Sequence, residues 1–341
     1  MSSDSQMFRE AAQAPGVVRD QLENNAPSVR RIGALLREMS PRAVVTCARG
    51  SSDHAATFAK YLIESHTKVL TSSAAPSLSS LYDAKTDLRN VVFVAISQSG
   101  KSPDLLCAVE NAKNCGACVI ALCNSMSSPL VQMADHAIPL CAGAETSVAA
   151  TKSYIASLSA IVHLLASWTL DDTLMTALLR TPEQLEHAWS QDWSRAVPLL
   201  RDAVNLYVVG RGFGLGVAQE AALKLKETCG LHAEAFSAAE VKHGPMALVG
   251  AGFPVLMLSQ NDESRAGIEE LARDFISRGA HVLMAGAQVT GSIALPAVPS
   301  HAVIEPILMI QSFYRMATAL AAARGLDPDA PPHLRKVTET I

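Results

Sequence analysis

The chain has 341 residues, a length that predicts about two domains. Hydrophobic residues make up 49% of the sequence and charged residues 18%, which excludes an intrinsically disordered chain and predicts a folded one with a large core. The formal net charge of −4 argues against a broad surface for nucleic acid or for an anionic membrane.

The first residues and the cysteines indicate a cytoplasmic protein. Residues 1–10 are polar and lack the apolar region of a signal peptide, and the longest charge-free stretch, 279–304, is broken by glycines and prolines. The seven cysteines are an odd number and lie mostly in apolar runs, which favours free thiols in a reducing compartment. A metal or redox site at Cys115 and Cys118 is the alternative.

Short runs rich in Val, Ile and Leu alternate with segments of helical spacing. The runs show no polar–apolar alternation, as is typical of parallel strands covered on both faces. The predicted strands are 42–47, 91–96, 118–122, 205–209, 254–258 and 281–284. Predicted helices include 53–64, 103–112, 146–169 and 305–324. This order predicts an α/β fold with parallel sheets.

The two halves of the chain align with each other. Arg49 and Ser97 each end a predicted strand, and Arg211 and Ser259 match them about 162 residues later. Residues 116–119 and 136–138 find similar matches at 279–282 and 301–303. Four matches in the same order at a nearly constant offset predict the duplication of one α/β unit.

The predicted elements divide the chain into five parts. These are a helical lead-in (1–30), a first α/β domain (31–170), a helical connector (171–200), a second α/β domain (201–325) and a tail that contributes to the site (326–341). The tail is rich in proline and follows Gly325, which is placed to end the last helix.

The turn SQSGKSP at 97–103 follows a predicted strand and begins a predicted helix. Its three serines, its glycine and the free N–H groups of a helix start suit a phosphate group, and Ser102 fits the helix cap. An ordinary serine-rich turn is the alternative. Ser51 and Ser52 follow another strand, and residues 145–152 begin a long helix, so three polar turns could converge on one ligand.

Two glycine-containing turns resemble nucleotide-binding motifs without completing them. The sequence Gly100-Lys101-Ser102 would need a glycine where the chain has Ala95, and the turn 210–216 has Leu215 where the dinucleotide-binding pattern has glycine. The sequence therefore predicts no nucleotide cofactor.

Three charged residues, Glu220, Lys224 and Glu227, have the spacing of one helix face. Spacing alone favours an exposed ladder of ion pairs. The other interpretation is a base beside a cation, which suits proton transfer next to a carbonyl group. The segment 232–245 that follows holds two His and two Glu among small residues, with little helix or strand pattern. Its spacing fits no compact zinc motif, so no metal site is predicted.

Together these segments resemble the isomerase part of glucosamine-6-phosphate synthase, a tandem of sugar isomerase (SIS) domains. The turn 97–100, the segment 145–152, the tail segment 334–338 and above all 222–245 carry the resemblance, which spans nearly the whole chain. It implies an α/β fold of two tandem SIS domains, each a three-layer α/β/α unit with a parallel sheet of flavodoxin-like type.

The resemblance implies a role for each matching position. Glu227 would shuttle a proton between C1 and C2 of the sugar, with Lys224 beside the C2 heteroatom and Glu220 supporting Lys224. His243 would open the sugar ring from the partner subunit, and Lys336 would reach the sugar carbonyl, where the synthase forms a Schiff base. The residues that would hold the phosphate and the sugar are Ser51, Ser52, Ser97, Gln98, Ser99, Ser102, Val148 and Ala149. No cofactor and no metal are implied.

The chain also departs from the synthase. Lys101-Ser102 stands in place of a Glu-Thr pair and Arg49 in place of a cysteine, so we expect some sugar contacts to differ. The glutaminase domain of the synthase, with its cysteine nucleophile at the start of the chain, has no counterpart before the first α/β unit. We therefore expect no glutaminase activity.

The expected function is isomerisation with hydrolytic deamination of an amino-sugar phosphate, from glucosamine-6-phosphate to fructose-6-phosphate and ammonia. The expected assembly is a homodimer with its sites at the interface, without nucleic acid or membrane partners. The same fold could instead act on galactosamine-6-phosphate or on a fructosyl-amino-acid phosphate. A sugar-phosphate-binding regulator without turnover is an alternative of another class.

Overall fold

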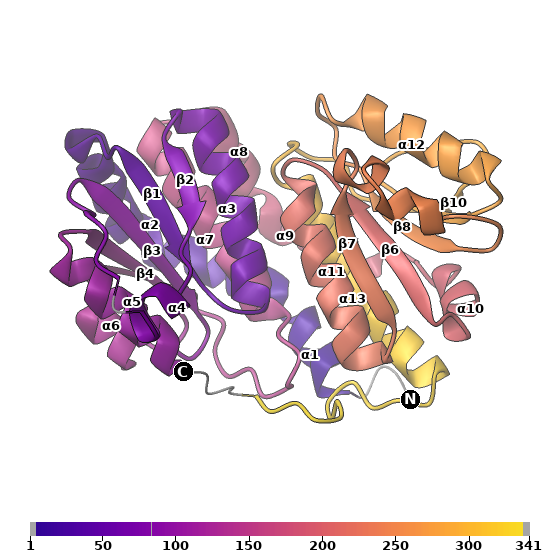
Figure 1. Cartoon of the computed structure of the whole chain (residues 1–341), viewed down its shortest axis with the longest axis horizontal. Coiled ribbons are helices and arrows are strands. Elements are labelled where there is room, and N and C mark those ends of the chain that lie inside the picture. Colours follow the sequence, from indigo (N-terminus) through magenta and orange to yellow (C-terminus); the bar gives the residue numbers. More distant parts are fainter. Residues whose placement is uncertain (1–4, 83, 337–341) are drawn as a thin grey trace. The chain divides into compact units, whose positions relative to one another are not determined.

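The computed structural model describes residues 5–82 and 84–336, which contain two five-stranded parallel sheets (Figure 1). Val337 and Thr338, which belong to the tail segment of the resemblance, lie outside the described residues. The first sheet consists of β1 (Ala43–Cys47), β2 (Leu70–Ser73), β3 (Val91–Ser97), β4 (Cys118–Cys123) and β5 (His136–Pro139). The second consists of β6 (Asn205–Gly210), β7 (His232–Ser237), β8 (Pro254–Leu258), β9 (His281–Ala285) and β10 (Ile293–Leu295).

Both sheets have the same strand order. It is β2-β1-β3-β4-β5 in the first and β7-β6-β8-β9-β10 in the second, and every pair is parallel. This is the flavodoxin-like order. The predicted α/β class with flavodoxin-like parallel sheets is confirmed, and the shared order supports duplication of one unit.

All six predicted strands are present, and each of the four strands that were not predicted is an edge strand. The edge strands β2, β5, β7 and β10 are short or partly exposed and lack the continuous apolar run of the central strands. One expectation was wrong for this reason: the segment 232–245 showed little strand pattern, yet residues 232–237 form β7.

Helices connect the strands. In the first half they are α1 (Gln6–Ala12), α2 (Ala14–Met39), α3 (Ser51–Thr67), α4 (Ser77–Ser80), α5 (Pro103–Asn114), α6 (Pro129–Met133) and α7 (Lys152–Thr169). Those that follow are α8 (Asp172–Leu179), α9 (Thr181–Ser190), α10 (Ala196–Arg201), α11 (Gly214–Cys229), α12 (Arg265–Ser277) and α13 (Glu305–Ala323). Two short 3-10 helices, Glu240–Lys242 and Pro245–Leu248, follow β7.

The start of α7 differs from the prediction, because the helix begins at Lys152 and not at Thr146. The buried Glu10 carboxylate of α1 accepts hydrogen bonds from the backbone N–H groups of Thr146 and Ser147 at 2.6 and 3.1 Å. A carboxylate thus satisfies these two donors outside the helix, and residues 146–151 stay non-helical.

Helices cover both faces of the first sheet. On one face Phe93 packs with Val109 of α5. The next residue, Val94, faces the other way, toward Ile63 of α3 and Leu165 of α7. This arrangement is the predicted three-layer α/β/α unit, and it explains why the central strands are apolar throughout.

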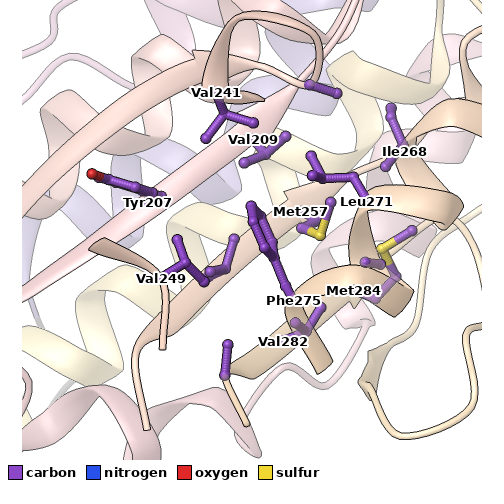
Figure 2. Close-up of a cluster of buried hydrophobic side chains, with 14 of the residues drawn as sticks. Tyr207, Val209, Val241, Val249, Met257, Ile268, Leu271, Phe275, Val282 and Met284 are labelled. Atoms are coloured by element: carbon purple, nitrogen blue, oxygen red, sulfur yellow. The ribbon is translucent and has the colours of Figure 1, made fainter. Parts of the chain in front are cut away.

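The second sheet repeats the arrangement. Figure 2 shows Phe275 of α12 in the middle of a buried cluster on one face, next to Met257 and Val282 of the central strands. The chain leaves β6 through α11 toward one edge, and leaves β8 through α12 toward the other. Because parallel crossovers are right-handed, α11 and α12 lie on opposite faces of the sheet.

The described residues form two compact units, one around each sheet. The β1–β5 unit contains 16–145, 153–179 and the tail residues 335–336. The β6–β10 unit contains the described residues up to 15, then 146–152 and 180–334. The domain ranges predicted from sequence follow chain order and stay a prediction, whereas these units take short segments from both ends of the chain.

The tail and the first helix are bound to each other within the β6–β10 unit. The Asp329 carboxylate accepts the N–H groups of Gln6 and Met7 at 2.5 and 2.7 Å and so satisfies the N-terminus of α1. Gln311 of α13 donates to the Ala11 carbonyl at 3.0 Å. In the part of the chain that is described, no helix is long and apolar enough to cross a membrane.

We expect Phe275→Ala to lower the free energy of unfolding by about 3–5 kcal/mol, because the ring fills the core beneath α12 and its removal leaves a cavity. Urea unfolding followed by circular dichroism measures the loss. Tyr82→Ala is the control, since Tyr82 is 73% exposed and its loss should cost less than about 0.5 kcal/mol. Equal losses in the two variants would show that the cluster in Figure 2 is not a close-packed core.

Candidate active site

Two polar turns lie at the carboxyl edge of the first sheet, after the neighbouring strands β1 and β3. From β1 the chain crosses through α3 to one side, and from β3 it crosses through α5 to the other. The strand order therefore reverses between β1 and β3. Open α/β sheets bind ligands in the crevice outside such a switch point.

The turn after β3 is built around a glycine. Ser97 is buried, and its Oγ accepts the N–H of Gly100 at 2.9 Å. Gly100 has φ of +64°, and a Cβ there would lie 2.3 Å from Ser128 Oγ, so glycine is required by conformation and by space. Gln98, Ser99 and Ser102 are half-buried along the same turn. The turn thus presents hydroxyl groups in front of the N-terminus of α5.

Two details of the helix starts differ from the sequence analysis. Ser102 and Pro103 take the predicted cap and first positions of α5, but the Ser102 side chain makes no capping hydrogen bond. The cap of α3 is Gly50, with φ of +55°, while Ser51 and Ser52 are half-buried in the first turn. The serine hydroxyls therefore do not serve as helix caps in either turn.

An ion pair that the sequence analysis missed crosses the switch point. Arg49, after β1, donates from Nε to the carboxylate of Asp104 at 2.8 Å and lies 2.7 Å from it through a terminal nitrogen. The Asp104 side chain is 2% exposed, so the guanidinium offsets a buried negative charge close to the serine turn. An acidic residue in the first turn of α5 was the available signal.

Cys47 ends β1 beside this turn. Burial raises the pKa of the Cys47 thiol to about 12. The positive charge of Arg49 lowers this pKa, and the negative charges of Asp104 and Asp53 raise it. The thiol therefore stays protonated near neutral pH. Cys47 packs in the core and is not a nucleophile.

The equivalent turn of the second sheet is occupied by its own side chains. Gln260 is fully buried, and its Nε2 donates to the Arg211 carbonyl and to the Asp262 carboxylate, both at 2.8 Å. Asp262 also accepts the N–H of Ser264 at 2.9 Å. Asp262 stands in the position of Gly100, with Glu263 after it, so this copy lacks the glycine turn of the first sheet.

The three charged residues of α11 form a buried cluster, so the exposed ladder of ion pairs is wrong. The side chains of Glu220, Lys224 and Glu227 are 0%, 1% and 19% exposed. Lys224 Nζ lies 3.6 Å from Glu220 Oε1 and makes a closer contact with Glu227 Oε2. The hydroxyl of Tyr314 on α13 donates to Glu220 Oε1 at 3.1 Å.

This cluster places one buried ammonium between two carboxylates, of which Glu220 is buried and Glu227 is 19% exposed. Removing the ammonium of Lys224 would leave two carboxylates facing each other in a buried position, which costs several kcal/mol. A purely structural ion pair would not need to border a cavity, whereas Glu227 also lines one. The arrangement therefore provides a carboxylate base with a fixed cation beside it.

The cavity beside Glu227 has a volume of about 610 Å³, within the range of ligand sites. It lies between the end of α11 and the tail. Its other lining residues are Leu223, Lys226, Thr228, Gly230, Gly325, Leu326, Asp327, Ala330, Pro332, His333 and Leu334. All belong to the β6–β10 unit, and more than half of this wall comes from residues after α13.

His243 lies at the other end of the second sheet. Glu227 is in the last turn of α11, next to the amino end of β7, and His243 follows the carboxyl end of that strand. The six residues of β7 span about 17–20 Å, so one chain does not bring the two side chains together. His243 is exposed, which leaves it available to a second subunit.

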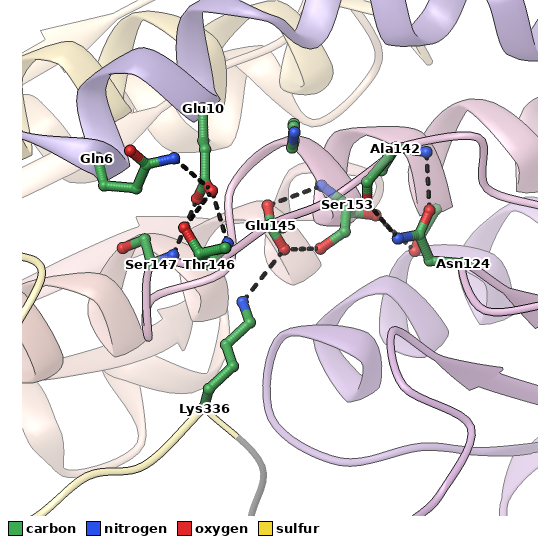
Figure 3. Close-up of polar contacts among 12 residues, drawn as sticks. Gln6, Glu10, Asn124, Ala142, Glu145, Thr146, Ser147, Ser153 and Lys336 are labelled. Carbon is green, nitrogen blue, oxygen red and sulfur yellow. Dashed lines mark hydrogen bonds and ion pairs between the residues drawn. The ribbon is translucent and has the colours of Figure 1, made fainter. Parts of the chain in front are cut away.

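The remaining predicted site residues lie in or near the segment between β5 and α7. Val148 is half-buried and Ala149 buried within the non-helical residues 146–151. Lys336 lies in the β1–β5 unit, where its Nζ is 3.5 Å from the buried carboxylate of Glu145 (Figure 3). Within residues 5–82 and 84–336, no three His, Cys, Asp or Glu side chains are grouped so that they could hold a metal ion.

Comparison with known proteins agrees with the tandem fold. The SIS domain family matches residues 39–167 and 199–322, one match on each sheet. The isomerising glutamine–fructose-6-phosphate aminotransferase of Thermotoga maritima is 33% identical over 327 residues, which cover 89% of this chain and 52% of that protein. The chain thus spans about half the length of the curated relatives it matches.

Two solved structures share the whole fold. A candidate phosphosugar isomerase from Silicibacter pomeroyi DSS-3 is 43% identical with a TM-score of 0.92, over 95% of this chain and 100% of that one. The C-terminal domain of glucosamine-fructose-6-phosphate aminotransferase from Francisella tularensis is 25% identical with a TM-score of 0.86, over 96% and 98%. The chain therefore belongs to the SIS domain family, with two SIS domains in tandem that are homologous to the isomerase part of that aminotransferase.

Proposed function

We propose that this chain isomerises and deaminates an amino-sugar phosphate, converting glucosamine-6-phosphate into fructose-6-phosphate and ammonia. The observation that carries the proposal is the buried cluster of Glu220, Lys224 and Glu227, with Glu227 on the wall of a cavity. The names of its relatives, an isomerising aminotransferase for fructose-6-phosphate and a candidate phosphosugar isomerase, support this class of substrate.

Glu227 is the base of the proposed reaction. In the open-chain sugar, C1 is an aldehyde and C2 carries a hydrogen and the amino group. Removal of the C2 proton by the carboxylate, with protonation of the C1 oxygen, gives an intermediate with a C1–C2 double bond. Return of the proton to C1 and loss of one from nitrogen leave an imine at C2. One carboxylate on one face of the sugar can serve both carbons.

Lys224 supplies the positive charge for this step. Its ammonium is fixed between Glu220 and Glu227, and Tyr314 holds Glu220 in turn. A preorganised cation in a site that excludes water stabilises negative charge that develops on the neighbouring heteroatom. Glu220 is therefore a positioning residue for Lys224, and Glu227 and Lys224 are the catalytic pair.

The deaminating direction that we propose uses water as its second reactant. Water attacks the imine at C2, the carbon–nitrogen bond breaks, and ammonia leaves as the ketone of fructose-6-phosphate forms. Two SIS domains can carry out this sequence with water alone, whereas amination needs a supply of ammonia. Ring opening is assigned to His243 of a second subunit, because β7 separates it from Glu227 in one chain.

The assay for this function incubates the chain with glucosamine-6-phosphate and measures ammonia and fructose-6-phosphate, which should appear in equal amounts. Galactosamine-6-phosphate and a fructosyl-amino-acid phosphate are tested in parallel. If product forms from only one of these two compounds, that compound is the substrate. Tight binding without product from any of the three compounds would favour a regulator.

Glu227→Gln should lower turnover by about 10²–10⁴-fold, because the amide cannot accept the C2 proton. Binding of glucosamine-6-phosphate, measured by calorimetry, should change little. Glu270→Gln is the matched control, since that carboxylate is 72% exposed on α12 of the same unit. Turnover close to wild type in Glu227→Gln would remove this residue from the role of base.

Gly100→Ala should weaken binding of the phosphosugar about tenfold or more, because the added Cβ meets Ser128 and the positive φ disfavours alanine. Calorimetry with glucosamine-6-phosphate measures the change. Gly16→Ala in α2 of the same unit is the control, since nothing lies within 4 Å of its Cβ position. Equal affinity in both variants would place the phosphate elsewhere.

Mixing Glu227→Gln and His243→Ala subunits should recover activity that neither variant has alone. With random exchange, about a quarter of the wild-type activity is expected, because half of the dimers are mixed and each has one intact site. Mass spectrometry of the intact dimer confirms the exchange. Confirmed mixing without recovered activity would place both residues in the site of one subunit.

A further inference from the structure

We propose that Glu145 is the docking carboxylate for the C-terminal tail, a positioning residue that fixes Lys336 for the sugar carbonyl. The contacts that support this docking role lie within the β1–β5 unit. Its effect on catalysis rests on the function proposed above. Figure 3 shows Lys336 extending from the tail toward Glu145.

Residues outside the tail hold the Glu145 carboxylate in place. Its side chain is 0% exposed, and both of its oxygens accept hydrogen bonds from Ser153 in the first turn of α7. The Ser153 N–H donates to Oε1 at 3.2 Å and the Ser153 hydroxyl donates to Oε2 at 2.5 Å. The N-terminus of α7 adds a favourable dipole for the negative charge.

The tail brings a positive charge to this buried carboxylate. Lys336 Nζ lies 3.5 Å from Glu145 Oε2, the same oxygen that accepts the Ser153 hydroxyl. The Lys336 side chain is 25% exposed, so its ammonium contacts a fully buried acid from a partly solvated position. The low dielectric around a buried acid strengthens the attraction between the two charges relative to a surface ion pair.

Lys336 differs in burial from the tail residues before it. Residues 332–335 are exposed, whereas Lys336 is half-buried against its partner. A lysine side chain has four rotatable bonds, and fixing them costs free energy that the ion pair with Glu145 offsets. The carboxylate thus restricts the position of the amine. A group that reacts with a carbonyl carbon must be held in such a fixed position.

The first test measures docking without substrate. The chain is treated with acetic anhydride, and mass spectrometry gives the rate of acetylation of Lys336 relative to Lys101, which is exposed. Glu145→Gln should raise the Lys336 rate about tenfold, since a charge-assisted contact is lost. Glu110→Gln, an exposed carboxylate on α5, is the matched control and should leave the rate unchanged. An unchanged rate in Glu145→Gln overturns the proposal.

Ser153→Ala provides a second variant if Glu145→Gln folds poorly by circular dichroism. It keeps the carboxylate but removes the hydroxyl that holds Oε2, so Lys336 acetylation should rise by a smaller factor. No rise in a folded Ser153→Ala variant, with none in Glu145→Gln, counts against the docking role.

The second test asks whether Glu145 acts through Lys336. Glu145→Gln should lower kcat with little change in KM, because the serine turn that binds phosphate is intact. In the Lys336→Met background, Glu145→Gln should have no further effect on kcat. Additive losses in the double variant would make Glu145 a structural residue independent of Lys336.

The two proposals can fail separately. Acetylation needs no turnover, so a chain without deaminase activity whose Lys336 is unmasked by Glu145→Gln keeps the docking role and loses the proposed function. A chain that deaminates glucosamine-6-phosphate normally, with acetylation and kcat insensitive to Glu145→Gln, keeps the function and loses the docking role.

Discussion

The fold depends on one constraint: a parallel sheet must be covered on both faces, because each of its strands needs a crossover connection. Right-handed crossovers leaving β1 and β3 toward opposite edges place α3 and α5 on opposite faces. The two turns then meet at one edge of the sheet, where polar groups from neighbouring strands gather. The serine turn and the Arg49–Asp104 ion pair both lie there.

Duplication produced two copies of this backbone, and side chains gave them different roles. The first copy keeps a glycine and hydroxyl groups at its switch point, whereas the second fills the same point with Gln260 and the carboxylate of Asp262. The second copy instead carries the charge cluster on the helix after its first strand. The serine turn and the charge cluster thus lie in different copies of one fold.

The central strands and most helices could be predicted from sequence, because burial on both faces produces continuous apolar runs. The edge strands could not be predicted, because sequences such as LTSS in β2 and HAEAFS in β7 contain no continuous apolar run. Each becomes a strand by pairing with the one strand beside it in the sheet. The predicted start of α7 was also wrong, because the Glu10 carboxylate of α1 accepts hydrogen bonds from the backbone of the residues before the helix. Glu10 is distant from them in sequence.

The sequence by itself determined the α/β class, the repeat, the serine turn and the spacing that puts Glu220, Lys224 and Glu227 on one helix face. Only the tertiary structure decided that this face is buried, that the tail forms part of the wall beside Glu227 and that Lys336 meets Glu145. Helical spacing is a local property of the backbone. Burial and the pairing of charges depend on which distant segments pack against that face, and local sequence does not encode those contacts.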